Sequence, residues 1–180
     1  MDLTRVLYSA ETLDVLVRLV GTRPTRIHMD SSHFQFEYEG RCLVTVWDWK
    51  AAIPSAMYEE LVYVIPRWYP DDVDSFPGFD GATVLASDVP IEATSVVRTL
   101  IWSNGLTTPA HPERVKAPIA HLVDVGFTAS VSGHELACFA QGNHLFSRWE
   151  GDFVDDANRA ALLERYQFVT LEEARRTLQA

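Results

Sequence analysis

Residues 25–49 alternate apolar and polar side chains so regularly that antiparallel strands are the natural reading of this stretch. Three aromatic residues share one side of the middle strand: Phe34, Phe36 and Tyr38. Glu39-Gly40 has the length of a two-residue hairpin turn, which places Tyr38 opposite Arg41 and Phe36 opposite Leu43 on a core-facing surface. We expect three strands here, at 25–30, 33–39 and 41–49.

Capping residues and apolar periodicity predict four helices. Ser9 can cap the first helix, and Gly21 can end it. Asp88 and Pro90 start a second helix, in which apolar residues, among them Val96 and Val97, recur on one face. This helix is expected to end at 104–105. Two terminal helices follow, one after the aspartates at 155 and 156 and one after the capping box at 170–173.

The remaining segments are more ambiguous. We expect 55–65 to be a short helix that runs into a strand, whereas 121–131 fits a helical turn or a strand equally well. Gly142-Asn143 predicts a type II′ hairpin between 135–141 and 144–149. The predicted fold class is therefore α+β, a single domain over 1–180 with an antiparallel sheet of about five to six strands and helices mainly on one face.

The order helix, three strands, helix, two strands, helix is similar to that of the type III secretion chaperones and YbjN-type domains. The similarity rests on this order and on the passage from Glu11 to Trp49, which has the pattern of a helix, a Gly-ended loop and a meander. It implies an architecture of that kind, while function has to be argued from the site itself.

The segment 66–81, PRWYPDDVDSFPGFDG, combines rings and carboxylates with prolines and glycines that disfavour regular structure. Residues 51–97 contain eight acidic side chains and one base, so this region carries −7 of the formal net charge of −10. We expect an exposed acidic loop that binds a basic partner, because aromatic anchors and complementary charge are typical of interfaces. The candidate binding residues are Trp47, Trp49, Trp68, Tyr69, Asp71, Asp72, Asp74, Phe76 and Phe79.

No residue pattern predicts a catalytic centre, a cofactor or a metal. Cys138 lies near His134 and His144 in the sequence, and a thiol beside an imidazole can act as a nucleophile. The predicted hairpin, however, places Cys138 opposite Ser147 and puts His144 on the other face of the sheet, so we expect a core cysteine. The six histidines lack zinc-site spacing, and the aspartates of 66–81 lack the order of a calcium loop. Glu37 and Glu39 are expected on one strand face about 7 Å apart, a distance compatible with acid/base chemistry, although solvated strand edges carry such pairs routinely and we favour that interpretation.

Composition excludes several other classes. Basic residues are scattered, which argues against nucleic acid and against anionic membranes as partners. The absence of a long apolar run, together with two cysteines outside any disulfide framework, predicts a cytoplasmic protein with reduced thiols.

Three hypotheses of function remain. The first is a non-enzymatic protein-binding module, either an immunity-type inhibitor or a secretion chaperone, with a basic protein as its partner. The second is a small-molecule enzyme or ligand carrier with a pocket between sheet and helices, in which His28, His33 or Glu37 would supply polar groups. The third is a structural subunit that forms a homodimer.

Overall fold

The computed structural model describes residues 2–29, 34–51, 60–70, 82–86, 89–102, 119–140 and 149–179. The strands are β1 (Asp2–Val6), β2 (Arg26–Met29), β3 (Phe34–Tyr38), β4 (Arg41–Ala51), β5 (Glu60–Pro70), β6 (Ala82–Ala86), β7 (Ile91–Trp102), β8 (Ile119–Val131), β9 (His134–Ala140), β10 (Trp149–Val154) and β11 (Gln167–Thr170). The helices are α1 (Ala10–Leu19), α2 (Asp156–Leu163) and α3 (Leu171–Gln179).

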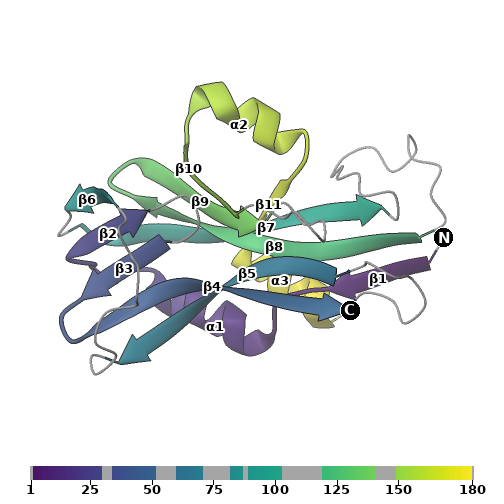
Figure 1. Cartoon of the computed structure of the whole chain (residues 1–180), viewed down its shortest axis with the longest axis horizontal. Coiled ribbons are helices and arrows are strands. Elements are labelled where there is room, and N and C mark those ends of the chain that lie inside the picture. Colours follow the sequence, from purple (N-terminus) through teal and green to yellow (C-terminus); the bar gives the residue numbers. More distant parts are fainter. Residues whose placement is uncertain are drawn as a thin grey trace.

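Within these residues the chain is mixed α/β, with three helices and two β-sheets (Figure 1). The five-stranded sheet has the order β5-β4-β3-β2-β6, and the six-stranded sheet has the order β10-β9-β8-β7-β11, with β1 paired in parallel to β8. The predicted single antiparallel sheet is therefore wrong, because the strands divide between two sheets that enclose a shared core.

The five-stranded sheet contains the meander predicted from the sequence. Tyr38 pairs with Arg41 and Phe36 with Leu43, as the two-residue turn requires, and Gly40 adopts a φ of +79°. The Thr45 side chain accepts a hydrogen bond from the Phe34 backbone N–H at 2.9 Å. The β3–β4 hairpin is confirmed in its pairing, and it positions the candidate site described below.

The predicted caps are also confirmed at three helices. The Ser9 side chain accepts from the Thr12 backbone N–H at the start of α1, and Gly21 follows α1 with a φ of +83°. Asp155 caps α2 in the same way, and the Thr170 hydroxyl accepts from the Glu173 N–H at 3.2 Å in the first turn of α3. These local signals succeed because each satisfies a backbone group that the helix itself leaves unpaired.

The helix predicted after Pro90 is wrong, because residues 91–102 form strand β7. Val96 and Val97 were assigned to one helical face, but they are both fully buried on opposite faces of the six-stranded sheet, between β8 and β11. A strand covered on both sides is apolar on both sides and can mimic helical spacing. The β-branched residues at 91, 94, 96, 97, 99 and 101 favour the strand.

Strand β8 resolves the ambiguity at 121–131 in favour of a strand and forms the centre of its sheet. One side pairs with β7, and the other is shared end to end by β1 at 119–123 and β9 at 126–131. Gly126 lies where β9 approaches most closely: a Cβ at this position would be 2.1 Å from the Cys138 carbonyl oxygen. Only glycine fits this approach.

The predicted partner of β9 is also corrected. Ala140 pairs with Trp149 and Cys138 with Gly151, so the paired strand is 149–154 rather than 144–149, and Cys138 does not oppose Ser147. The predicted Gly142-Asn143 turn, and the connection predicted at 105–118, lie outside the described residues.

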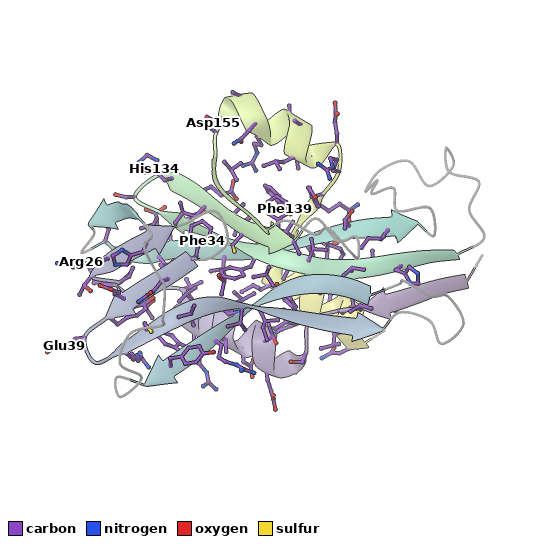
Figure 2. The ribbon with its side chains drawn as sticks, in the orientation of Figure 1. Arg26, Phe34, Glu39, His134, Phe139 and Asp155 are labelled. Atoms are coloured by element: carbon purple, nitrogen blue, oxygen red, sulfur yellow. The ribbon has the colours of Figure 1, made fainter. Side chains whose placement is uncertain are left out.

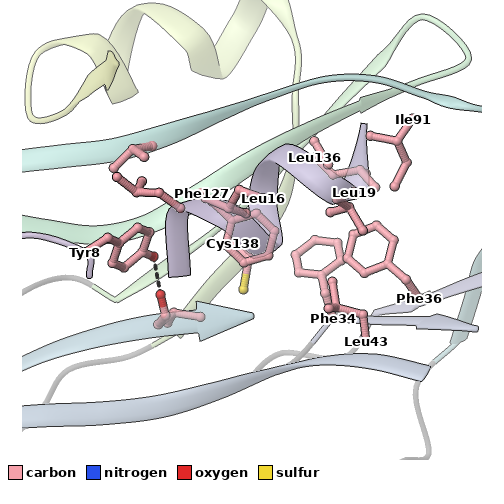
Figure 3. Packing of buried hydrophobic residues seen from close by; sticks show 14 of the residues in the cluster. Tyr8, Leu16, Leu19, Phe34, Phe36, Leu43, Ile91, Phe127, Leu136 and Cys138 are labelled. Atoms are coloured by element: carbon pink, nitrogen blue, oxygen red, sulfur yellow. Dashed lines mark hydrogen bonds between the residues drawn. The ribbon is translucent and has the colours of Figure 1, made fainter. Parts of the chain in front are cut away.

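The core has two parts, one on each face of the six-stranded sheet. Between the sheets, leucines of α1 pack against Phe34, Phe36 and Leu43 of one sheet and against Phe127 and Leu136 of the other (Figure 3). On the far face, α2 covers a second cluster in which Phe139 and Tyr166 place their ring centroids 4.7 Å apart. Helices therefore cover both faces of this sheet, rather than mainly one face as predicted.

Tyr8, between β1 and α1, joins the two sheets. Its backbone N–H donates to Asp124 Oδ2 on β8 at 2.9 Å, and its hydroxyl donates to the Val64 carbonyl oxygen on β5 (Figure 3). Asp124 is in turn paired with Arg98 of β7, with Nε 2.6 Å from Oδ1, and both side chains are almost fully buried. Arg98 also donates to the Thr177 hydroxyl of α3. This buried pair thus connects β7, β8 and α3 with the β1–α1 connection, next to the place on β8 where β1 ends and β9 begins.

Candidate functional site

The candidate site lies at the end of the five-stranded sheet where β5 leads into the acidic segment. Pro70, the last residue of β5, pairs with Arg41, which follows the β3–β4 turn. Arg26 at the start of β2 and Glu39 in that turn lie at this same end (Figure 2). Of the predicted binding residues, Trp68 and Tyr69 belong to β5, whereas Asp71, Asp72, Asp74, Phe76 and Phe79 lie outside the described residues.

The prediction that irregular structure begins at Pro66 is wrong, because β5 continues through Pro70. Proline has no N–H to donate to a neighbouring strand, so it fits a strand only where that bond is not required. Pro66 and Pro70 are four residues apart and therefore point their backbone nitrogens to the same side of β5. Val64, two residues before Pro66, directs its carbonyl to Tyr8 and away from β4. The backbone nitrogens of both prolines therefore lie on the edge of β5 that points away from β4, the outer edge of this strand.

Trp68 and Tyr69 do not form one patch, since consecutive residues of a strand point to opposite faces of the sheet. Trp68 pairs with Leu43 on the inner face, where it packs against the core cluster and is half-buried. Tyr69 pairs with Cys42 on the outer face and is also half-buried. The expectation that all these rings project into water is corrected for Trp68.

The backbone positions of Trp47 and Trp49 are on the same face of the sheet as that of Trp68, but further along it. Trp47 pairs with Val64 and Trp49 with Val62, whereas Trp68 pairs with Leu43. At about 3.3 Å per residue, position 47 is ~13 Å along β4 from position 43. The register therefore separates these two positions from Trp68 instead of joining them into one compact patch.

Two residues that were not predicted as binding residues complete the surroundings of Trp68. The Tyr38 and Trp68 ring centroids are 5.2 Å apart with an interplanar angle of 53°. The guanidinium carbon of Arg41 lies 4.3 Å from the Trp68 centroid and 5.8 Å from the Tyr38 centroid. We call Tyr38, Arg41 and Trp68 the ring corner. The hairpin turn, which pairs Tyr38 with Arg41, was the signal in the sequence that could have identified it.

Burial and a hydrogen bond hold Tyr38 in place within the ring corner. Its hydroxyl is 2.9 Å from the Thr22 hydroxyl oxygen, and Thr22 in turn donates to the Leu19 carbonyl at the end of α1. Burial raises the pKa of Tyr38 above its usual value of 10.0, and the bond to Thr22 and the charge of Arg41 offset part of this rise. Tyr38 is therefore neutral at physiological pH. Its hydroxyl is hydrogen-bonded to Thr22, and its ring lies beside that of Trp68.

On the outer face, a row of paired residues crosses four strands: Arg26, Glu37, Cys42 and Tyr69. His28, next to this row on β2, places Nε2 3.0 Å from Glu37 Oε1. Cys42 is half-buried and not in a disulfide. Because β3 separates β2 from β4, Cys42 and His28 are ~10 Å apart across the sheet, too far for a thiol to transfer its proton directly to the imidazole.

The predicted pair of Glu37 and Glu39 is not an acid/base pair in the structure. Glu37 belongs to β3 and faces His28, whereas Glu39 lies in the β3–β4 turn and is exposed. Their side chains therefore have different surroundings. His33, the third polar residue considered for a ligand site, lies outside the described residues.

Cys138 lies in the core cluster with 3% of its surface exposed, as predicted for a core cysteine. His134 is four residues away at the exposed start of β9, and His144 is not among the described residues. A buried thiol at this distance from an imidazole is not an activated nucleophile.

Among the described residues, no group of three or more His, Cys, Asp or Glu side chains could hold a metal ion. In the same part of the chain, the helices are all too short or too polar to cross a membrane. Comparison with protein-family models, curated proteins and solved structures finds no match to this chain.

Proposed function

We propose that this protein is a non-enzymatic binding module that uses an acidic, aromatic surface to engage a basic protein. The observation that carries the proposal is the end of β5, which holds Trp68 half-exposed beside an exposed arginine and leads, after Pro70, into Asp71, Asp72 and Asp74. A ring anchored against a core offers contact area at little cost in side-chain entropy, and nearby carboxylates attract a basic partner from a distance.

The charge distribution supports the same function. Residues 51–97 contribute −7 of the net −10. Such a field raises the association rate and makes it sensitive to salt. An inhibitor of the immunity type or a secretion chaperone would each use a surface of this kind. The order of elements does not favour the chaperone, because the helix expected between the two groups of strands is strand β7.

The test is charge reversal of Asp71, Asp72 and Asp74 to lysine, after capture from the native host has provided the partner. We expect the affinity to fall at least tenfold by isothermal titration, with most of the loss in the association rate and less of it at high salt. A control with the same charge change, Glu11, Glu164 and Glu172 to lysine, alters exposed residues outside 51–97 and should lose much less. Equal loss in both variants would assign the effect to net charge and refute the proposed surface.

A second candidate function, a ligand carrier, is favoured by the His28–Glu37 pair. The two side chains are 3.0 Å apart and half-buried on a sheet face that also presents Arg26. A screen of small molecules by thermal shift would test it: a ligand of this site raises the melting temperature of the parent protein but not that of Glu37→Gln. If no compound separates the two proteins, this second function is refuted.

A further inference from the structure

The ring corner shows which kind of basic residue its surface accepts. A cation is attracted to an aromatic face when it lies within about 6 Å of the ring centroid. Arg41 meets this distance for two rings at once, at 4.3 Å from Trp68 and 5.8 Å from Tyr38. The two rings are inclined at 53° to each other, so they form an open angle rather than a flat stack.

The rings are held against the core, whereas the cation is exposed. Trp68 and Tyr38 pack against the core cluster, and the Tyr38 hydroxyl is held by Thr22. Arg41 is exposed, and its position next to the Glu39-Gly40 turn lets its side chain leave the rings by rotating about its own bonds. A preformed aromatic site occupied by an exposed side chain of the same protein can exchange that side chain for one from outside.

We propose that Tyr38 and Trp68 form a binding site for an arginine of a basic partner, and that Arg41 occupies this site in the free protein. The inference rests on the proposed function and makes it more specific, because it names the partner's side chain. Arginine is favoured over lysine, since its planar, weakly hydrated guanidinium stacks on aromatic faces. The sequence also supplies negative charge to attract an arginine, because the acidic segment begins three residues after Trp68.

Exchange predicts that Arg41 weakens binding in the native chain. The incoming arginine gains a contact with the rings only as Arg41 gives up an equivalent one, and the two like charges repel. Removal of Arg41 should therefore tighten binding by about two- to fivefold, the fold-change that corresponds to one exposed cation–π contact.

The experiment uses the full chain and a nonapeptide of alternating glycine and arginine, followed through the indole N–H signals in ¹H–¹⁵N spectra. The Trp68 signal is the one that disappears in Trp68→Phe. We expect the peptide to shift this signal, and Arg41→Gln to bind it two- to fivefold more tightly than Arg67→Gln does. Arg67 is the matched control, because it is an exposed arginine on β5 whose position faces the other side of the sheet. The same peptide with lysine in place of arginine should bind more weakly.

Equal affinity of Arg41→Gln and Arg67→Gln would mean that only net charge matters and would overturn the proposal, as would a Trp68 signal that does not move at saturation. Neither result depends on a variant of the core, because both arginines are exposed and both variants should fold. If the variants are equal but reversal of Asp71, Asp72 and Asp74 abolishes peptide binding, the acidic surface stands and the arginine site is refuted. If Arg41→Gln binds more tightly and the reversal has no effect, the arginine site stands and the acidic surface is refuted.

Discussion

The buried pair of Arg98 and Asp124 offers the sharpest test of how this fold is held together. The perturbation is a double-mutant cycle of Arg98→Met, Asp124→Asn and the two combined. Methionine keeps most of the volume of the arginine stem, and asparagine keeps an oxygen that can accept from the Tyr8 backbone N–H. The cycle therefore removes the charges while leaving the packing and the Tyr8 bond largely in place.

The expected magnitudes follow from burial and from the bonds that are lost. The side chains are only 5% and 1% exposed, so solvent screens neither charge. Either single substitution leaves one ion buried without its counter-ion, which costs about 3–5 kcal/mol of the free energy of unfolding. The double variant buries no charge and loses only the two bonds of Arg98 to Asp124 and its one bond to Thr177, at about 1 kcal/mol each. The coupling free energy should therefore be about 3 kcal/mol or more.

Urea unfolding followed by far-ultraviolet circular dichroism measures these free energies, provided that the m-value stays constant across the four proteins. The exposed bridge between Arg175 and Asp14, whose side chains are 45% and 50% exposed, is the matched control. The cycle Arg175→Met with Asp14→Asn should give a coupling of at most about 1 kcal/mol. If the coupling at Arg98 and Asp124 is as small as in this control, the reasoning from burial is wrong.

Three further predictions test the backbone, the ring corner and the thiols. Gly126→Ala should cost about 3 kcal/mol or more in urea unfolding, because its Cβ would lie 2.1 Å from a backbone oxygen that has no room to move; a loss below about 1 kcal/mol would contradict the close approach of β9. The pKa of Tyr38 is raised in the folded protein, so its contribution to stability is complete below pH 10 and is lost as the pH rises through the folded pKa. Tyr38→Phe should therefore lose less stability than the parent between pH 9 and pH 11, and parallel curves would show that Tyr38 has no such role. Iodoacetamide at neutral pH should label half-buried Cys42 in the folded protein and leave Cys138 unlabelled until urea is added, as mass spectrometry of the peptides can show; rapid labelling of Cys138 would refute its burial.

The elements that could be predicted from the sequence are those whose causes are local. Ser9, Asp155 and Thr170 mark helix starts because their side chains bond to backbone N–H groups two or three residues away. The Glu39-Gly40 turn sets the register of β3 and β4 without help from the rest of the chain. Both kinds of signal act over a few residues, and a sequence pattern contains them in full.

The errors concern relations between distant segments. β1 pairs with β8 in parallel, although more than a hundred residues separate them, and no periodicity in 2–6 indicates that partner. Residues 91–102 were predicted as a helix because burial on both faces of a central strand removes the alternation of apolar and polar residues that identifies a strand. Whether a strand is central or at an edge depends on the tertiary fold, so the pattern alone could not decide between the two.

The prediction of the site failed in part for a related reason, and the error bears on function. Two prolines in five residues were read as a break in regular structure, yet Pro66 and Pro70 both face the outer edge of β5, where no ladder bond is required of them. The strand therefore continues to the first aspartate, and its alternation places Trp68 on the inner face and Tyr69 on the outer face. A loop would have let both rings turn to one partner. A strand holds Trp68 beside Tyr38 and Arg41, so a partner that reaches this ring must do so by displacing or joining the arginine above it.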